Sequence, residues 1–514
     1  MRDALLLLVL ALASFAPFYA YPEWRGTEAR RVEVANSMAQ SGDYLVPRLW
    51  NEETFAKPPF YYWILSTLIR LGGQEPWLMR LPSLLGFWLL AFMALRYLRE
   101  WHDATTGWVG AVGILVSPLV MYDAPFAEID PVFAVLTALS LFCLSDGVFQ
   151  QRRGALVIAG VLGGLAVMTK GPPYLMFFVG PIYLWFRHSR MRGILWYLPF
   201  VFGFYLVYKL VLDQAGPSVA AGAVAVDETV GRLAFWNTEA LAGIPTHFLN
   251  CLVVIGLPLS FWLVPWFRGA RKSRDDATER SRFLLWGAFG AFLVLTFSTG
   301  RASRYLLPAV PMVICGLAPL VANSLQSGGA PTRNTRRALL GFGTLMAIAA
   351  VALPWVKYPY PGTTGIALLA LVSVGWFVHS QRRLVQFALA LPLIVGWAAF
   401  PDRIEYHRCA ADFAPHSAAV LGRELQRRGV AVAGSYGPVN TSVLLHARES
   451  MGSPLEVYAD SQRRHSPVRP WLLVMDRGAA RKSAGGGVEL VAGYRDVLRV
   501  QTDKNKSISL RAKQ

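Results

Sequence analysis

The feature that most constrains this chain is a series of long apolar runs joined by short polar connections. Only 16% of its 514 residues are charged, and its mean hydropathy is +0.38. These values exclude a soluble globular enzyme, a disordered chain and a disulfide scaffold, and they predict a polytopic membrane protein. Thirteen predicted spans lie at 4–19, 79–97, 105–121, 130–148, 154–169, 173–186, 194–212, 246–267, 283–298, 304–325, 337–356, 363–379 and 383–400.

The basic connections predict the orientation of these spans. Arginine clusters occur at 96–102, 152–153, 187–192, 268–282, 333–337 and 382–383. All six lie on the cytoplasmic side if Met1 is cytoplasmic and the short apolar stretch 60–71 does not cross the membrane. If that stretch crosses, Met1 moves to the opposite side. Its length favours an interfacial helix, so we expect the loop 21–78 and everything after residue 400 to be extracytoplasmic.

The composition changes after residue 400. Residues 417–429 have the pattern of an amphipathic helix, and 430–434, 471–476 and 488–491 have that of strands. We therefore expect a small α/β domain at 401–514. The chain contains no Walker loop, CxxC pair or HExxH motif, so nothing points to ATP, nucleic acid or zinc-protease chemistry.

The first outer loop is dense in charge. Residues 28–40 have helical spacing, with Val32, Ala35 and Met38 on one stripe and Gly42 as a C-cap. A Lys-Pro-Pro turn at 57–59 then precedes a group of interfacial aromatic residues. A solvated amphipathic face would explain such charges, but their grouping favours a site.

Further polar residues occur at predicted outer ends of spans. Asp130 precedes Pro131, which suits either a helix N-cap or a functional carboxylate. The candidate cations on the outer side are Arg30, Arg31, Lys57, Lys170, Arg301 and Arg304, and the candidate carboxylates are Glu28 and Asp130. Such cations suit a lipid phosphate, and a neighbouring carboxylate suits a base or a stabiliser of a cation-like sugar centre. We therefore expect transfer of a group from a lipid phosphate.

These motifs together resemble a known family. The matching stretches, over roughly residues 1–400, are 26–38, 41–47, 57–63, 80–83, 129–131, 168–172 and 301–308. They resemble the GT-C-type integral membrane glycosyltransferases, in the bacterial branch of the lipid A aminoarabinose transferases, which is related to the dolichyl-phosphate-mannose-protein mannosyltransferases. The resemblance implies a GT-C transmembrane domain at 1–400, interfacial helices in a first periplasmic loop at 21–78, and a periplasmic α/β domain at 401–514.

The resemblance also implies an activity. It is that of an inverting inner-membrane enzyme that moves a sugar from a polyprenyl-phosphate donor to a periplasmic-face acceptor, which is lipid A, another glycolipid, a glycan or a protein. It makes Glu28 and Asp130 the catalytic carboxylates. The donor-phosphate ligands that it implies are Arg30, Lys57, Arg232 and Tyr305, and the further site candidates are Thr27, Arg31, Arg80, Lys170, Arg301 and Arg304. It implies membrane lipids as surroundings, no nucleic acid as partner and no cofactor.

The chain departs from the family pattern at two places. The family's Asp-Glu pair is Thr27-Glu28 here, so either Glu28 or Asp130 is the principal carboxylate. The aminoarabinose transferases hold a metal with a Glu and a His, whose positions are Ala56 and about Thr229 here. We therefore expect no such metal site, and an activity distinct from that of the aminoarabinose transferase itself.

Two other functions would use the same charges. A transporter or flippase of an anionic lipid would need cations, but it should also place charges inside its spans and show paired halves. A structural subunit of an envelope assembly would use the basic tail as a docking surface. Neither accounts for the loop motifs.

Overall fold

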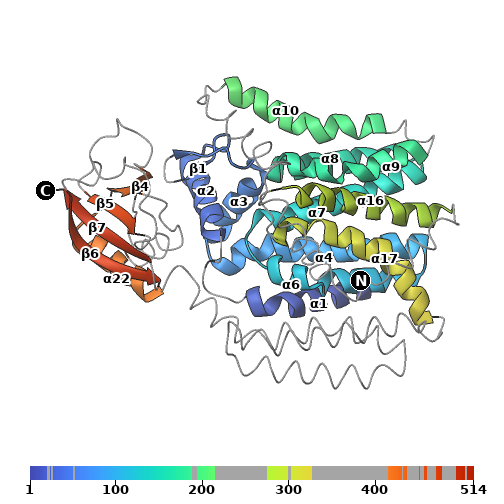
Figure 1. The fold of residues 1–514 in the computed structure, drawn as a ribbon, viewed down its shortest axis with the longest axis horizontal. Helices are drawn as coiled ribbons and strands as arrows, with labels where there is room; N and C mark the ends of the chain where they lie inside the picture. The colour runs from blue at the N-terminus through green and yellow to red at the C-terminus, as the bar shows by residue number, and fades with distance from the viewer. Residues whose placement is uncertain are drawn as a thin grey trace, which may run out of the picture. The chain divides into compact units, whose positions relative to one another are not determined.

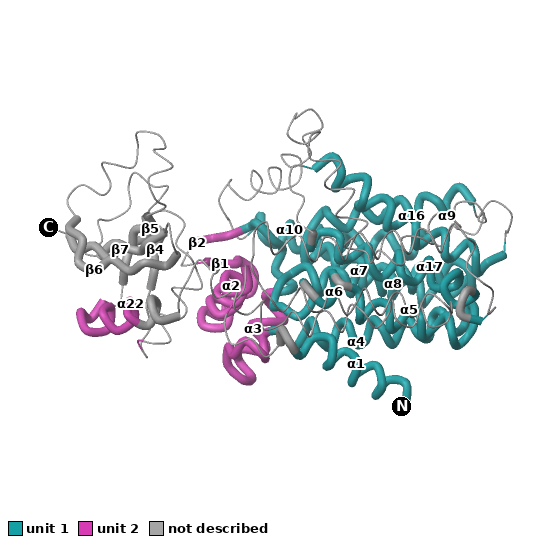
Figure 2. The backbone as a smooth tube through the Cα atoms, turned by 60° about the horizontal axis from the view of Figure 1, so that its bottom comes forward, with its two compact units in different colours: residues 1–21, 55–61, 80–400 teal, residues 22–54, 62–79, 401–514 magenta. Residues whose placement is uncertain are grey.

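The computed structural model describes most of the first 214 residues and parts of the remainder. The described residues are 1–19, 24, 27–49, 52–187, 194–214, 275–298, 303–326, 415–430, 432–436, 451, 456–459, 471–476, 494–503 and 506–513. They divide into two compact units, coloured in Figure 2. Unit 1 comprises 1–21, 55–61 and 80–400, and unit 2 comprises 22–54, 62–79 and 401–514.

Unit 1 is a helical bundle. Its described elements are α1 (Arg2–Tyr19), α4 (Pro76–Trp101, from Arg80 on), α5 (Ala104–Leu115), α6 (Pro118–Asp123), α7 (Ile129–Phe149), α8 (Arg153–Lys170), η1 (Pro172–Phe178), α9 (Val179–Arg187), α10 (Leu198–Gln214), α16 (Asp276–Thr296), η3 (Ser303–Leu306) and α17 (Ala309–Gln326). Helices α7, α8, α16 and α17 run side by side (Figure 1). Helix α1 belongs to the same core through Leu7, Ala11 and Phe15.

Most predicted spans in the described residues are helical. Among these residues, four helices have the length and apolar character needed to cross a membrane: Pro76–Trp101, Ile129–Phe149, Arg153–Lys170 and Ile194–Gln214. The predicted span 105–121 is instead two helices, because Pro118 has no N–H to donate and its ring disfavours helical backbone before it. The predicted spans 246–267, 337–356, 363–379 and 383–400 lie outside the described residues.

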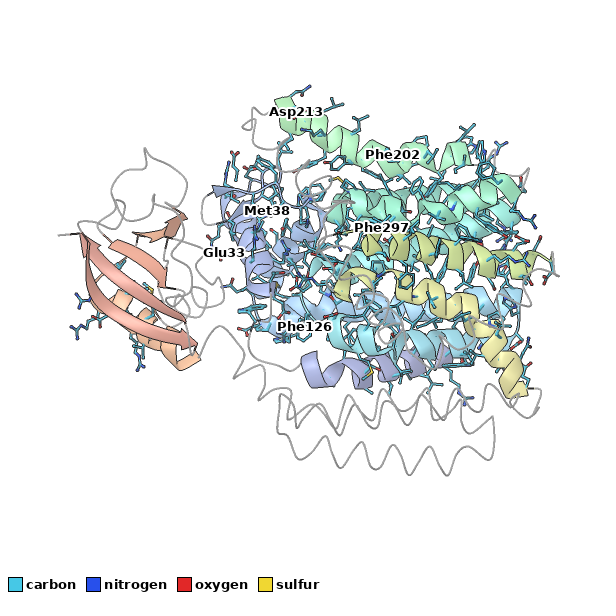
Figure 3. The ribbon with its side chains drawn as sticks, in the orientation of Figure 1. Glu33, Met38, Phe126, Phe202, Asp213 and Phe297 are labelled. Carbon is cyan, nitrogen blue, oxygen red and sulfur yellow. The ribbon has the colours of Figure 1, made fainter. Side chains whose placement is uncertain are left out.

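Glycines on α8 allow α10 to pack closely against it. A Cβ atom at Gly160 would lie 2.6 Å from the carbonyl oxygen of Tyr197, and one at Gly164 would lie 2.4 Å from that of Phe200. In a membrane, helices gain little from burying apolar surface against one another, so small residues that permit backbone contact decide where they pack. The outer surface of α10, which carries Phe202 (Figure 3), is largely exposed in unit 1.

A chain of buried hydroxyl groups joins α7, α8 and η1 to Tyr197, the residue before α10. Ser140 on α7 donates a hydrogen bond to the carbonyl of Ala159 on α8, at 2.7 Å. Its oxygen lies 2.7 Å from the hydroxyl of Tyr174, which lies 2.8 Å from that of Tyr197. Because the Ser140 hydroxyl donates its proton to the carbonyl of Ala159, it accepts a hydrogen bond from Tyr174. The Tyr174 hydroxyl in turn accepts a hydrogen bond from Tyr197. Each hydroxyl in the chain therefore has a partner, as buried polar groups require.

The start of α16 carries buried charges that fasten it to its neighbours. Arg280, 1% exposed, pairs with Asp146 on α7, and its guanidinium carbon lies 3.2 Å from the ring centroid of Trp101. Glu279 accepts hydrogen bonds from Tyr183 and Arg282. Burial raises the pKa of the Glu279 carboxyl, but the hydrogen bond from Tyr183 and the charges of two arginines outweigh burial, so this pKa lies below its ordinary value.

Unit 2 contains part of the first loop and the described part of the C-terminal segment. Its elements are α2 (Glu28–Ser41), β1 (Arg48–Leu49), β2 (Glu52–Glu53), α3 (Phe60–Gly72, from Tyr62 on), α22 (Pro415–Arg427), β3 (Val432–Tyr436), β4 (Glu456–Ala459), β5 (Trp471–Asp476), β6 (Tyr494–Asp503) and β7 (Lys506–Lys513). The C-terminal sheet has the order β4-β3-β5-β7-β6. Strands β4, β3 and β5 are parallel, and β7 is antiparallel to β5 and β6.

Several predicted elements of unit 2 are confirmed. Strand β5 has the predicted bounds, and α22 and β3 lie within two residues of theirs, whereas the predicted strand 488–491 lies outside the described residues. Helix α2 ends as predicted at Gly42, which has φ 74° and donates its N–H to the carbonyl of Met38. The solvated-face alternative for α2 is wrong, because Glu28 is fully buried and Glu33 (Figure 3) is 5% exposed.

Candidate functional site

The centre of the candidate site in unit 1 is a buried carboxylate held by two cations. Asp130, in the first turn of α7, accepts a hydrogen bond from Lys170, and both side chains are less than a tenth exposed. The Nε atom of Arg304 in η3 lies 3.8 Å from the other oxygen of Asp130. Because α7 and α8 pack along each other and are joined by a short turn, the first turn of α7 and the last turn of α8 lie at the same end of the bundle.

The N-cap interpretation of Asp130 is wrong. Helix α7 begins two residues earlier than that interpretation requires, and Glu128 occupies the N-cap position with extended backbone (φ −106°, ψ 160°). Asp130 uses its carboxylate for the ion pairs instead. The local preference of aspartate for helix starts is outweighed here by the charges that the fold places opposite it.

Two aromatic rings surround the cations. The ammonium nitrogen of Lys170 lies 4.5 Å from the ring centroid of Tyr305 and 5.2 Å from that of Phe133. The guanidinium carbon of Arg304 lies 5.7 Å from the same Tyr305 ring. These contacts are cation–π interactions, which supplement an ion pair where water is scarce. With them the structure brings together four of the predicted site residues, Asp130, Lys170, Arg304 and Tyr305, from distant parts of the chain. Phe133, which the sequence analysis missed, joins them.

The Lys-Pro-Pro turn lies beside the turn that follows α8. A Cβ atom at Gly171, whose φ is +86°, would lie 3.9 Å from Cγ of Pro58. Lys57 directly precedes Pro58, and Lys170 directly precedes Gly171. Two predicted cations therefore occupy adjacent turns of unit 1. Lys57 is half-buried.

Arg80 takes a different position from the other cations. It is fully buried on α4, and its guanidinium carbon lies 5.4 Å from the ring centroid of Phe126. Phe126 lies in the irregular segment that leads into α7 (Figure 3). Arg80 thus lies against a side chain of the segment that precedes Asp130.

The remaining described candidates lie on α2 in unit 2. Thr27 is its N-cap residue, Glu28 its first residue, and Arg30 is half-buried. Arg31 donates a hydrogen bond from Nη1 to the hydroxyl of Tyr62 on α3, at 3.0 Å. The predicted candidates Arg232 and Arg301 lie outside the described residues.

The expected absence of a metal site rests on two positions, of which the structure describes one. Residue 56 is alanine, which has no ligand atom in its side chain, and position 229 lies outside the described residues. Within the parts of the chain that the structure describes, no group of three or more His, Cys, Asp or Glu side chains is placed to bind a metal ion. The absence of a metal site stays a prediction.

Comparison with known proteins identifies the class. Residues 56–212 match the family described as dolichyl-phosphate-mannose-protein mannosyltransferase. The undecaprenyl phosphate-alpha-4-amino-4-deoxy-L-arabinose arabinosyl transferase of Pseudomonas savastanoi is 25% identical over 460 residues, which cover 82% of each chain. A second relative, undecaprenyl phosphate-alpha-4-amino-4-deoxy-L-arabinose arabinosyl transferase 2 of Pseudomonas fluorescens, is 24% identical. That match covers 72% of this chain and 66% of the relative.

Solved structures show the same fold. The crystal structure of ArnT from Cupriavidus metallidurans bound to undecaprenyl phosphate has a TM-score of 0.73 at 16% identity, covering 98% of this chain and 97% of that one. The chain is a GT-C-type glycosyltransferase resembling the aminoarabinose transferases. Among other solved structures, the arabinosyltransferase EmbB from Mycobacterium smegmatis has a TM-score of 0.52 at 14% identity, and the match covers 80% of this chain and 42% of EmbB.

Proposed function

We propose that this glycosyltransferase moves a sugar from an undecaprenyl-phosphate donor to an acceptor at the periplasmic face of the inner membrane. The observation that carries the proposal is the buried Asp130–Lys170–Arg304 cluster beside the Lys57 turn, in a chain that has the ArnT fold over nearly its whole length. In this proposal residues 1–400 form the transmembrane domain, with a cytoplasmic N-terminus, and residues 401–514 form a periplasmic domain.

The cluster around Asp130 suits positioning more than phosphate binding. The positive charges of Lys170 and Arg304 are matched by Asp130 and by the neighbouring buried Glu128. A charge-balanced group has little excess charge to offer an anion. We therefore assign the donor phosphate to Lys57, with Arg30 as a second cation and Arg232 and Tyr305 as weaker candidates.

The proposed reaction is a single displacement, which inverts the anomeric carbon. The acceptor oxygen forms a bond to that carbon while the bond from the carbon to the phosphate oxygen breaks, and undecaprenyl phosphate leaves. The Lys57 ammonium would stabilise the negative charge that grows on the phosphate. If the acceptor is a hydroxyl, its proton passes to a carboxylate, for which we propose Glu28, because both oxygens of Asp130 already face cations.

The number of carboxylates available to act as a base bears on the class of acceptor. A hydroxyl acceptor requires a base, whereas a phosphate acceptor is already anionic. Thr27 replaces the family's aspartate, so this enzyme has one carboxylate fewer at the start of α2. We propose lipid A or another glycolipid as acceptor, with a glycan or a protein as alternatives that the experiment below separates.

The test compares Glu28→Gln and Lys57→Ala with wild type in a deletion strain, by mass spectrometry of envelope glycolipids and glycans. We expect both variants to lose the same sugar-sized mass, and the molecule that loses it is the acceptor. Two matched controls should keep the mass. They are Glu53→Gln, at an exposed glutamate of β2, and Lys209→Ala, at a partly exposed lysine that pairs with Asp213 at 3.0 Å.

Two outcomes would contradict the proposal. If Glu28→Gln and Lys57→Ala both restore the wild-type mass profile, the loop has no catalytic part and a lipid transporter becomes the better interpretation. If all four variants lose the mass while inserting normally, the loss reflects general damage and the assignment of the site fails.

A further inference from the structure

The segment that leads into α7 is irregular and buried. Residues 124–128, between α6 and α7, form neither helix nor strand, and each of them is buried. Buried backbone outside regular structure needs hydrogen-bond partners from elsewhere. Ser83 on α4 supplies one: its hydroxyl donates to the carbonyl oxygen of Phe126 at 2.9 Å, and the whole residue is inaccessible to solvent.

Arg80 contacts the same residue from the same helix. It lies three positions before Ser83, so both side chains are on one face of α4. Its guanidinium carbon is 5.4 Å from the Phe126 ring centroid. Ser83 thus binds the main chain of Phe126 while Arg80 lies against its ring.

Phe126 is only four residues before Asp130. The intervening residues are Ala127, Glu128 and Ile129, each less than a tenth exposed and packed inside unit 1. Because these three residues are closely packed, a displacement of Phe126 should also shift the first turn of α7.

We propose that Arg80 and Ser83 are positioning residues that hold Phe126 and thereby aim the Asp130 carboxylate at Lys170 and Arg304. The inference rests on the proposed function and deepens it. It gives Arg80, until now a site candidate without an assigned role, the role of supporting the carboxylate. It also explains why a serine lies one helical turn after a buried arginine in a motif that the reaction itself does not use.

The expected signature is a loss of turnover without a loss of donor affinity. A displacement of about 1 Å in the groups that position the reactants is enough to cost on the order of 100-fold in rate. Ser83→Ala leaves every proposed phosphate ligand in place. We therefore expect it to bind undecaprenyl phosphate within twofold of wild type, by native mass spectrometry of the purified full chain, while product formation in membranes falls at least tenfold.

Ser140→Ala is the matched control. Ser140 is equally inaccessible to solvent and also donates its hydroxyl to the backbone carbonyl of another element, at 2.7 Å. It is ten residues along α7 from Asp130, about 15 Å away. We expect its thermal unfolding midpoint to fall at least as much as that of Ser83→Ala, with product formation within twofold of wild type.

Two further variants keep the test decisive if Ser83→Ala does not fold. Ser83→Cys keeps a weaker donor of similar size and should give intermediate turnover, and Arg80→Lys should lower turnover with undecaprenyl phosphate binding unchanged. Equal losses in the Ser83 and Ser140 variants, no loss at Ser83, or a loss confined to binding would overturn the inference. A wild type that transfers no sugar would instead mean that the proposed function has failed.

Discussion

The buried pair between Asp130 and Lys170 leads to a prediction in which stability and activity respond differently. Lys170→Met removes the ammonium but keeps a side chain of similar length beside Tyr305 and Phe133. It leaves Asp130, whose side chain is 9% exposed, with Arg304 at 3.8 Å. Removing one partner of a buried ion pair costs about 3–5 kcal/mol. Because Arg304 remains, we expect a loss near the lower end, about 3 kcal/mol.

The double variant Asp130→Asn/Lys170→Met separates the two effects. Removing both charges together avoids an uncompensated buried carboxylate, so we expect stability within about 1 kcal/mol of wild type. Activity should not return, since the ion pair that we propose positions the site is absent. The pair would then be retained for the reaction and not for stability.

The assay measures the thermal unfolding midpoint of each purified variant in the same detergent at one heating rate, together with product formation in membranes. Membrane-protein unfolding is commonly irreversible, so only midpoints taken at equal rates are comparable. We expect the single variant to lose several degrees and the double variant to recover most of them. A double variant as unstable as the single one would refute the energetic reasoning, and one with wild-type transfer would refute the functional role.

Two further predictions concern the rest of unit 1. Gly164→Ala should weaken the packing of α10 on α8 and lower the thermal unfolding midpoint, because the added Cβ would lie 2.4 Å from a backbone carbonyl oxygen. Gly154→Ala on the same helix should be neutral, because no atom lies within 4 Å of the added Cβ. Equal midpoints in the two variants would contradict this. The pKa of Glu279 lies below its ordinary value, because the hydrogen bond from Tyr183 and the charges of two arginines outweigh burial, so its contribution to stability should be complete above about pH 4.5 and lost as the pH falls further. Glu279→Gln should flatten this acid dependence of the unfolding midpoint, and an unchanged profile would count against the assignment.

Local patterns in the sequence predicted much of the fold. Apolar runs of spanning length located α4, α7 and α8, and the period of residues 28–40 with Gly42 located α2 and its left-handed C-cap. These features depend on neighbours within one or two helical turns, so a single sequence contains the information. The break at Pro118 is equally local, but the continuous apolar character of 105–121 concealed it.

The candidate site was predicted as a set of residues and not as an arrangement. Asp130, Lys170 and Arg304 were each singled out, because charge at the end of an apolar span is costly and therefore informative. Tyr305 was given by the family resemblance. The sequence could not say that Asp130 pairs with Lys170 instead of capping α7. The outcome depends on which charges the packing of α7, α8 and η3 brings within reach.

The sequence by itself determined that the chain is a membrane protein, where most of its described helices lie, and which residue types gather at their ends. Only the tertiary structure decided that Glu28 and Arg80 are fully buried, that Ser83 binds the carbonyl of Phe126, and that Asp130 faces two cations. Burial and pairing depend on contacts between segments far apart in the chain. Those contacts are set by the sum of many weak packing interactions, which no local pattern records.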